Sequence, residues 1–544
     1  MSRTTSLPAY LQQIITHGSF VGLNYGGLHD SSIFIADNNG QPLFASSLER
    51  LSRVKQDGRP PLCLLDAIPW HKVNSLATSS RIHKPLSDHS NSVYLQSSQR
   101  RVLPGTHHQS HPDSYIRVVT DIPVPVFEFC HHECHAASAF WHSGFDSAVC
   151  LVYDGGVYTN PWFGGVYMAS SQSGIQALDH FDRFSYPNIA DLYSFVTAIL
   201  GFTPNRHEGK ITGLAATGQV VKECVEILKD WLVSFTPSTS RVSTWINCFS
   251  IDHVPQVIVH ESRIAQYRKA LSLYNRQDIA ASLQYLCEQE MLLLFESISQ
   301  HHKAKPLCLS GGLFSNVRIN ELASNFDFPH IFVSPAMTDD GTASGAAWLR
   351  LFQTGVSTTL TTKTVFLGTP PSYTNNADHL DSMNIQYNRL NNPYKAISKL
   401  LASGKIVALC HGPAEYGPRA LGNRSILAGA LDPTVNNRLN SKLKRTEFMP
   451  FAPVILEEDR LTLLSNLTPL TNCLPFMTTT IKTTPSLQAS APAAVHVDGT
   501  ARPQVVSASD NPLLHSILTS YKNLTGSPAL LNTSFNIHEE PIVG

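Results

Sequence analysis

The chain has 544 residues, 42% of them hydrophobic and 15% charged, and its 40 basic side chains balance 41 acidic ones. This length exceeds one ordinary hydrophobic core, so two or three domains are expected. The neutral balance argues against a nucleic-acid binder, and the lack of a long apolar run argues against a membrane span. Ten cysteines without a CxxC pair argue against zinc ribbons and fit a reducing cytoplasm.

The first structural signal is a plan that occurs twice. "SFVGLNYGG" is an apolar run that ends in glycines, and "SSIFIADNNGQPLFASSLER" adds two strand-like runs around an Asn-Asn-Gly turn. After a polar stretch over residues 74–115, interpreted as an insertion, "SAVCLVYDGG" and "WFGGVYMASSQSGIQALDHF" follow the same plan. The repeat predicts a duplicated unit, as in an actin-like ATPase fold built from two ribonuclease-H-like halves.

Two later segments fit the same architecture. "KPLCLSGGLFSNVRIN" reads as a strand, the turn Gly311–Gly312 and a helix, and "HIFVSPAMTDDGTASGAAWLRLF" reads as a strand, an acidic turn and a small-residue helix. Backbone amides behind such glycines can approach ribose or phosphate closely. Lys210 in "HEGKITGLAATG" resembles a phosphate contact, although the Walker pattern is not matched. Ordinary strand-to-helix connections are the alternative.

A composition shift near residue 360 predicts a domain boundary. The sequence is therefore divided into residues 1–358 and a second α/β domain over residues 372–544. The sequence stops at "NIHEEPIVG", directly after a strand-like run. Either a last helix lies outside this sequence or the second domain is short.

The stretch "HHECHAASAFWHSG" predicts a metal site if it is helical. His131 and His135 then lie on one face, four residues apart. The spacing is not the His-Glu-x-x-His of metalloproteases, so carboxylates must come from elsewhere: Asp154, and Asp339 or Asp340. Such a set suits iron, manganese or zinc. Packing or capping histidines are the alternative, and a buried structural histidine is likewise the alternative to His29 as a general base beside Asp30.

A further group of candidate site residues is basic. In "HGPAEYGPRALGNRSILAGALDPTVNNRLNSKLKRTEFMPFAP" the residues Gly417, Pro418 and Gly422 break any helical period. Arginines on such a loop present planar forks suited to phosphate or carboxylate. The pattern predicts an anion pocket, with a solvated loop as the alternative. Ser534 and Asn536, in "LLNTSFNIHEEPIV", are candidates to complete this anion pocket.

The ordered motifs resemble those of the carbamoyltransferase family that includes the NodU/CmcH-type and nebramycin-type enzymes, which make carbamate esters. The resemblance runs through most of the chain, in the order "HDSS", "SLERLSRVKQDG", "HHECHAASAF", "HEGKITGLAATG", "LSGGLFSNVRIN", "DDGTASGAA", "EYGPRALGNRSILA", "RTEFMPFAP" and "NTSFNIHEEPIV". It implies an α/β fold in which an actin-like domain is followed by a domain similar to threonylcarbamoyladenylate synthase (YrdC-like). Met449 stands where many members have arginine.

The resemblance also implies a mechanism and its partners. The C-terminal domain would convert carbamoyl phosphate and ATP, with magnesium, to carbamoyladenylate. The N-terminal domain would transfer the carbamoyl group to a hydroxyl of a small natural-product acceptor. A homodimer is one option, and neither nucleic acid nor a membrane is an expected partner. Iron is the favoured metal, with manganese or zinc as alternatives.

The family pattern carries over to individual residues of this chain. The implied metal ligands are His131, His135, Asp154 and Asp339. The implied nucleotide contacts are Lys210, Gly213, Gly311, Gly312 and Asn316. The implied contacts to carbamoyl phosphate are Arg419, Arg424, Lys444, Arg445, Ser534 and Asn536. The implied catalytic residues are His29, Asp30 and Arg424.

Other functions of the same domain types remain as alternatives. A tRNA threonylcarbamoyl-type enzyme would need a tRNA-binding surface, and a hydrogenase-maturation enzyme would carry zinc fingers, for which the CxxC pairs are missing. A non-catalytic actin-like regulator would have no need for the histidine pair, both aspartates and the arginine loop together.

Overall fold

The computed structural model describes most of the chain. The described residues are 7–25, 29–59, 61–80, 93–95, 101–103, 118–120, 122–155, 162–182, 188–233, 246–251, 254–259, 261–356, 364–371, 380–445 and 451–544. Most of the insertion predicted over residues 74–115 lies outside them, as does Met449.

The first sheet contains the first copy of the repeated plan. Its strand order is β3-β2-β1-β4-β8-β5, and the central β1 pairs antiparallel with β2 and parallel with β4. The Asn-Asn-Gly turn closes the β2–β3 hairpin, where the Asp37 amide donates to the Gln41 carbonyl at 3.0 Å. The strands are β1 (Ser19–Asn24), β2 (Ser32–Ala36), β3 (Pro42–Ser47), β4 (Val73–Ser80), β5 (Val93–Leu95) and β8 (Val126–Cys130).

The second sheet repeats this plan. Its order is β11-β10-β9-β14-β15, with the central β9 antiparallel to β10 and parallel to β14. In both sheets the first strand of the unit pairs antiparallel with a hairpin on one side and parallel with a later strand on the other. The predicted duplication is therefore confirmed. The strands are β9 (Ser147–Tyr153), β10 (Trp162–Ser170), β11 (Gly174–Asp182), β14 (Leu307–Ser310) and β15 (Ile331–Val333).

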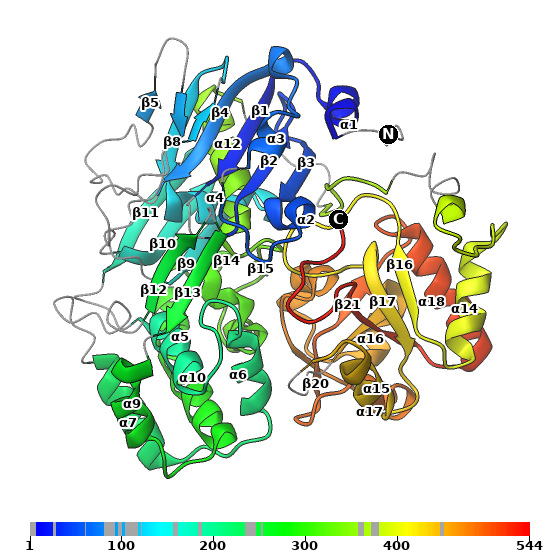
Figure 1. The fold of residues 1–544 in the computed structure, drawn as a ribbon. Helices are drawn as coiled ribbons and strands as arrows, with labels where there is room; N and C mark the ends of the chain where they lie inside the picture. The colour runs from blue at the N-terminus through cyan, green and yellow to red at the C-terminus, as the bar shows by residue number, and fades with distance from the viewer. Residues whose placement is uncertain are drawn as a thin grey trace.

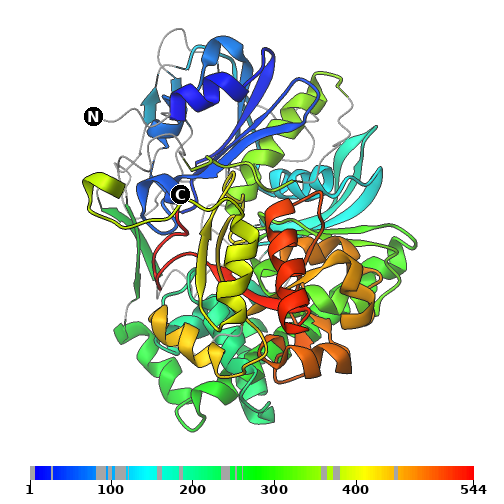
Figure 2. The same cartoon turned by 90° about the vertical axis from the view of Figure 1, so that its right-hand side faces the viewer.

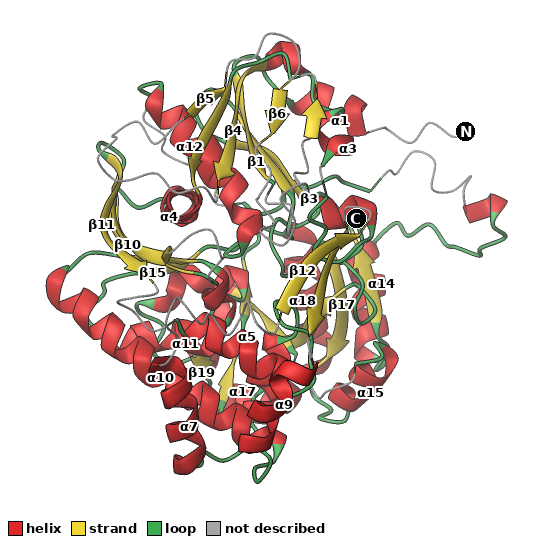
Figure 3. Ribbon diagram, turned by 60° about the vertical axis from the view of Figure 1, so that its left-hand side comes forward, coloured by secondary structure: helices red, strands yellow, loops and turns green. Residues whose placement is uncertain are grey.

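Two helices, α4 (His131–Ser143) and α12 (Thr342–Gln353), lie between the two sheets (Figure 3). Small residues allow this close packing, because a Cβ added to Gly345 would lie 1.8 Å from the Cys134 carbonyl oxygen on α4. A Cβ on Gly22 of β1 would meet the Ala343 carbonyl oxygen at the same distance. The glycine- and alanine-rich helix that follows the acidic turn therefore fits between β1 and α4 for steric reasons.

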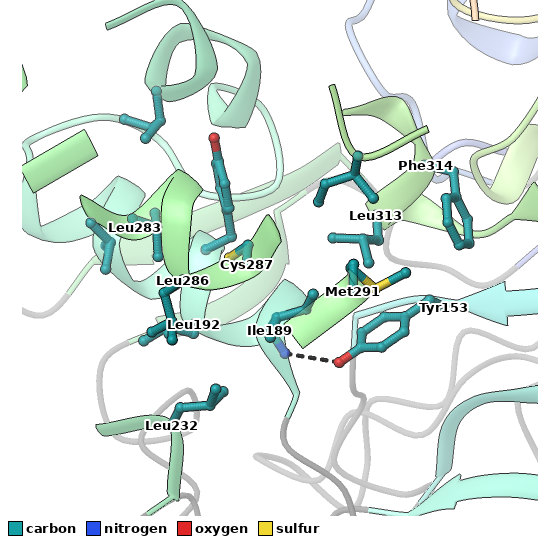
Figure 4. Packing of buried hydrophobic residues seen from close by; sticks show 14 of the residues in the cluster. Tyr153, Ile189, Leu192, Leu232, Leu283, Leu286, Cys287, Met291, Leu313 and Phe314 are labelled. Carbon is teal, nitrogen blue, oxygen red and sulfur yellow. Dashed lines mark hydrogen bonds between the residues drawn. The ribbon is translucent and has the colours of Figure 1, made fainter. Parts of the chain in front are cut away.

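The other face of the second sheet is covered by a helical layer. Val149, Leu151 and Tyr153 of β9 pack into this layer, whereas the alternate residues Cys150 and Val152 face α4. The Tyr153 hydroxyl accepts a hydrogen bond from the Ile189 amide at 3.0 Å, at the start of α5 (Figure 4). The layer includes α5 (Ile189–Ile199), α6 (Glu208–Ala215), α7 (Lys222–Val233), α9 (Glu261–Ala270), α10 (Arg276–His301) and α11 (Val317–Leu322).

The third sheet belongs to the C-terminal part of the chain and is also mixed, with the order β16-β17-β22-β18-β21. Helices α14 (Pro393–Ala402) and α18 (Pro512–Thr525) lie side by side on one of its faces (Figure 2). Its strands are β16 (Val407–Cys410), β17 (Arg424–Gly429), β18 (Ala452–Leu456), β21 (Gln504–Val506) and β22 (Ala529–Ser534). On the opposite face packs α15 (Val435–Lys442).

The two parts of the chain share a buried core. Tyr416 and Leu421 pack in one apolar cluster with Phe34 and Trp348 of the first part. The chain end lies beside α2 (Leu48–Ser52), where the Arg53 side chain donates to the Ile542 carbonyl at 2.7 Å (Figure 1). In the described part of the chain, no helix has the length and apolar character needed to cross a membrane.

Candidate functional site

The structure brings together four predicted metal ligands from three elements. His131 and His135 project from the first turns of α4, Asp154 follows β9, and Asp339 opens the 3-10 turn Asp339–Gly341 that precedes α12. One ligand atom from each residue lies within 4.8 Å of the other three. The ends of the two duplicated halves therefore converge on one point.

The distances within this cluster suit a shared cation, and the contact between His131 Nε2 and Asp154 Oδ2 also meets hydrogen-bond geometry. His131 Nε2 lies 3.3 Å from both Asp154 Oδ2 and Asp339 Oδ1, and His135 Nε2 lies 3.8 and 3.4 Å from the same two atoms. Ligand atoms bound about 2.1 Å from a metal lie about 3.0–3.4 Å apart along the edges of an octahedron or tetrahedron. The His135 Nε2 atom is buried without a hydrogen-bond partner. Its surroundings fit a metal.

Neighbouring groups orient these ligands. Ser310 Oγ lies 3.1 Å from His135 Nδ1 and 3.5 Å from the Met337 carbonyl oxygen, to which it donates. The hydroxyl therefore accepts from His135 Nδ1–H, which leaves Nε2 unprotonated toward the cluster in the neutral form of the ring. The Gly312 amide donates to Asp154 Oδ1 at 3.0 Å and leaves Oδ2 for the cluster.

The histidines and aspartates of the cluster shift one another's pKa values. Burial alone lowers the pKa of His135, but the nearby carboxylates of Asp154 and Asp339 outweigh burial and raise the pKa to about 9. Burial and the Asp339 charge raise the pKa of Asp154, whereas the two histidines lower it well below its usual range, and the histidines dominate. The carboxylates therefore favour a positive charge at this point.

Three further residues surround the cluster. Asp340, the alternative ligand, is not among the residues whose ligand atoms converge, and burial and the charges of Asp30 and Glu49 raise the pKa of its carboxyl far above the usual range. His29 Nδ1 lies 3.1 Å from Asp30 Oδ2 and 3.7 Å from Asp339 Oδ2. A carboxylate only accepts, so Nδ1 carries the proton and Nε2 is the basic nitrogen of the neutral ring.

The predicted nucleotide contacts have other functions in this structure. The Gly311 amide donates to the Met337 carbonyl and the Gly312 amide donates to Asp154, so neither amide is available to a phosphate. Gly311 has φ +109°, and a Cβ there would lie 2.3 Å from the Tyr153 carbonyl oxygen. The turn needs glycine for this close approach, and a role of Gly311 and Gly312 in nucleotide binding stays a prediction that cannot rest on their amides.

The remaining nucleotide candidates are also engaged within the protein. Asn316 caps α11, because its Oδ1 accepts from the Arg318 and Ile319 amides, and its Nδ2 donates to Gln284 Oε1 at 2.8 Å. Lys210 is buried, with its Nζ 3.1 Å from His538 Nε2. Gly213 lies inside α6. Asn316 thus caps a helix and joins it to α10, Gly213 lies within a helix, and Lys210 joins the two parts of the chain.

Arg424 does not line a pocket. Its side chain is 0% exposed, with Nη1 3.0 Å from the carbonyl oxygens of His411 and Gly412 and Nη2 2.9 Å from that of Thr369. These backbone acceptors engage both terminal nitrogens of the guanidinium and hold the chain in place, whereas Nε is buried without a hydrogen-bond partner. The assignment of Arg424 to catalysis and to carbamoyl phosphate therefore stays a prediction beside this structural role.

Arg419, Arg445 and a third arginine, Arg502, form an uncompensated cationic group. Burial lowers the pKa of both Arg419 and Arg445 to about 10, and burial together with the charges of those two arginines lowers the pKa of Arg502 far more. Among the described residues, none of the three has an ion pair with a carboxylate within 4.0 Å. Buried cations without a counter-charge are costly unless an anion joins them. We name Arg419, Arg445 and Arg502 the arginine cluster.

Hydrogen bonds place the arginine cluster between the two parts of the chain. Arg419 Nη2 donates to the Ser315 carbonyl at 3.4 Å, just beyond the Gly311–Gly312 turn, and its Nε is buried without a partner. Arg445 donates to Thr533 Oγ1 at 2.8 Å. Arg502 was not among the predicted residues. The signal for it is an arginine between Gly499 and Pro503, in a context like that of Arg419.

The other predicted phosphate contacts are Lys444, Ser534 and Asn536. Lys444 is exposed. Ser534 Oγ donates to Asn536 Oδ1 at 2.6 Å, and Asn536 Nδ2 donates to the Glu540 carbonyl at 2.7 Å. Ser534 and Asn536 therefore brace each other at the end of β22, next to Thr533.

A second histidine group, His207, His538 and Glu539, is close enough to share an ion but is better explained without one. His207 Nδ1 accepts from the Thr203 amide at 3.1 Å, so Nε2 carries a proton, which it donates to Glu539 Oε1 at 2.7 Å. His538 Nε2 lies 3.1 Å from Lys210 Nζ. These contacts form a hydrogen-bonded seam between α6 and the C-terminal tail.

Fold and site together describe a two-domain α/β protein with one candidate centre in each domain, one suited to a cation and one to an anion. The family models that match this chain are Carbamoyltransferase N-terminus, over residues 98–348, and Carbamoyltransferase C-terminus, over residues 398–544. The chain therefore belongs to the carbamoyltransferase family and is a carbamoyltransferase.

Individual relatives agree with this membership. An uncharacterized protein of Methanocaldococcus jannaschii is 32% identical over 434 residues, covering 76% of this chain and 69% of the relative. Nodulation protein NolO of Bradyrhizobium diazoefficiens is 31% identical over 76% of this chain and 74% of its own length. Among solved structures, full-length HypF in its phosphate- and nucleotide-bound form is 13% identical with a TM-score of 0.31, covering 62% of this chain and 56% of that one.

Proposed function

We propose that this carbamoyltransferase is ATP-dependent and works in two steps, one in each domain. Residues 372–544, as a YrdC-like domain, form carbamoyladenylate from carbamoyl phosphate and ATP. Residues 1–358, as an actin-like domain, transfer the carbamoyl group to a hydroxyl of a small natural-product acceptor in the cytoplasm. The observation that carries the proposal is the arginine cluster, a partly buried group of cations without a carboxylate counter-charge among the described residues, in the domain assigned to phosphate chemistry.

The arginine cluster supplies what the first step needs. Hydrolysis of carbamoyl phosphate gives carbamate and phosphate, and a carbamate oxygen then attacks the α-phosphorus of ATP while pyrophosphate leaves. Both events gather negative charge on phosphoryl oxygens, which closely placed guanidinium groups stabilise. Arg419 and Arg445 bind phosphate groups in this proposal, and Arg502 joins them. Lys444, Ser534 and Asn536 contribute at the rim, and Lys210 lies near the nucleotide.

The metal cluster serves the second step. His131, His135, Asp154 and Asp339 would hold a divalent cation. Imidazole and carboxylate together suit iron, manganese and zinc, and iron is the metal that we propose. When bound, such an ion would supply a Lewis acid for a carbonyl group. His29 receives the acceptor hydroxyl proton on Nε2, and Asp30 holds the ring through Nδ1. The hydroxyl oxygen then bonds to the carbamoyl carbon, and AMP departs with the electron pair.

A coupled assay tests the whole proposal. The protein is incubated with carbamoyl phosphate, ATP and a panel of alcohols, while AMP, pyrophosphate and carbamoylated products are quantified by mass spectrometry. We expect one AMP and one pyrophosphate for each ester formed. Omission of the alcohol should leave only slow turnover. Nucleotide cleavage that never yields an ester with any acceptor would reduce the protein to a synthase or hydrolase.

A further inference from the structure

One loop of the C-terminal part contacts the turn that carries a predicted metal ligand of the other domain. It covers residues 411–423 and links β16 to β17, and we name it the bridging loop. Its base is fixed by Glu415, whose Oε1 accepts from the amides of Leu421 and Asn423 at 2.7 and 2.8 Å. Its tip packs against the N-terminal domain, because Arg50 Nη2 donates to the Gly417 carbonyl at 2.9 Å.

Tyr416, at the start of this tip, contacts the turn that carries Asp339. Its side chain is 3% exposed, and its hydroxyl donates to the Asp340 carbonyl oxygen. The same carbonyl accepts from Ser32 Oγ at 2.9 Å. The 3-10 turn Asp339–Gly341 is therefore held by one hydroxyl from its own domain and one from the other.

We propose that Tyr416 is a positioning residue for the metal centre, acting across the domain boundary through the Asp340 carbonyl. This inference rests on the proposed metal role of Asp339. A ligand carboxylate must be held within a fraction of an ångström, and groups that orient ligands affect metal affinity strongly. Asp339 is the one ligand of the four whose backbone turn is braced from the C-terminal domain by a described side chain. The metal centre is complete only when the bridging loop is docked.

The Tyr416→Phe variant isolates the hydroxyl. The ring remains packed near Phe34, with centroids 6.2 Å apart, so the apolar core is retained. Full-length protein is stripped of metal and titrated with Co²⁺ in competition with a chelator, following the visible absorption of bound cobalt. We expect the Kd for Co²⁺ to rise about tenfold, the lower end for groups that orient ligands.

A matched control removes a hydroxyl of the same kind elsewhere. Tyr521 on α18 is also buried in the C-terminal domain, and Tyr521→Phe should leave the Kd for Co²⁺ unchanged. Ser32→Ala, which removes the other donor to the Asp340 carbonyl, should raise the Kd in the same direction as Tyr416→Phe.

The adenylate-forming step separates this inference from the proposed function. Carbamoyl phosphate-dependent exchange of pyrophosphate into ATP should be unchanged in Tyr416→Phe, because Glu415 holds the base of the bridging loop independently. An equal loss of exchange would show that Tyr416 only supports the arginine cluster, and would overturn the inference. If the parent protein binds Co²⁺ normally and the Kd of the Tyr416→Phe variant is unchanged, the inference is overturned and the proposed function is not. Failure of the parent protein to bind Co²⁺ would remove the metal centre as well.

Discussion

The metal cluster and the arginine cluster are both partly buried groups of charges, but they differ in how they can compensate for a missing ligand. In the metal cluster the charges have both signs, and protons can replace an ion: the pKa of His135 rises to about 9 while that of Asp154 falls. In the arginine cluster all three pKa values fall, because burial disfavours the charged forms and, for Arg502, the charges of Arg419 and Arg445 add to it. Guanidinium groups do not release their protons at neutral pH.

This difference predicts opposite responses to ligand removal. A metal-free His-Asp cluster retains internal attraction and should leave the fold intact. An anion-free arginine cluster retains repulsion, so it should destabilise the resting protein and bind phosphate-bearing ligands in compensation. The two centres therefore differ in which ligand state the fold favours, and mutations can test that contrast.

The largest expected effect concerns the metal cluster. Asp154→Asn should lower carbamoyl transfer by about 10³-fold or more, because the ion loses a charged ligand that two imidazoles cannot replace. Exchange of pyrophosphate into ATP should persist. Metal content and both half-reactions are measured on the same preparation. Asp230→Asn, an exposed change on α7, is the control. Parallel loss of both half-reactions in a folded protein would end the division of labour between the domains.

The second effect concerns the arginine cluster, where one substitution should lower the activity and raise the stability. Arg502→Ala should lower kcat/KM for carbamoyl phosphate about 10²- to 10³-fold, by analogy with loss of one charge-stabilising donor. The same change should raise the melting temperature of the ligand-free protein, because it removes repulsion from Arg419 and Arg445. Arg438→Ala, at an exposed site on α15, should change neither quantity. Destabilisation by Arg502→Ala would contradict the uncompensated charge.

The third effect distinguishes Arg424 from its neighbours in sequence. Arg424→Ala should lower the free energy of unfolding by about 3 kcal/mol, because buried carbonyl groups lose their donors. Urea titration measures this loss. Arg419→Ala should be less destabilising and should act mainly on the kinetics. A stable Arg424→Ala protein with a raised KM for carbamoyl phosphate would place Arg424 in the binding site.

The smallest effect belongs to the seam of His207 and Glu539, where an imidazole N–H donates to a carboxylate. The hydrogen bond from His207 lowers the pKa of Glu539 to about 2, below its ordinary value of 4.5. The carboxylate therefore stabilises the fold above about pH 4.5, and this contribution is lost as the pH falls toward 2. Glu539→Gln should be mildly destabilising at pH 7, with a deficit that shrinks below pH 4.5 in urea titrations. A deficit constant with pH would rule out the ionised pair.

Local sequence signals predicted much of the scaffold and the metal cluster. The hydrophobic runs that end in glycines predicted both central strands, and the four-residue spacing of His131 and His135 follows from helix geometry alone. Partners of functional groups were harder to predict. The glycine pair at Gly311 and Gly312 carries the composition of a phosphate-binding turn, but its amides are bonded to Met337 and Asp154. Composition does not reveal which acceptor an amide meets.

The arginines show the same limit most clearly. Sequence alone identified a glycine- and proline-rich basic loop and the family to which it belongs, since both depend on residue types in order. Only the tertiary structure decided that Arg424 faces backbone carbonyls, that Arg502 joins Arg419 and Arg445, and that Tyr416 reaches the Asp339 turn. Whether a charged side chain binds a ligand or supports the chain depends on the groups that surround it in space. Those groups come from segments tens to hundreds of residues away.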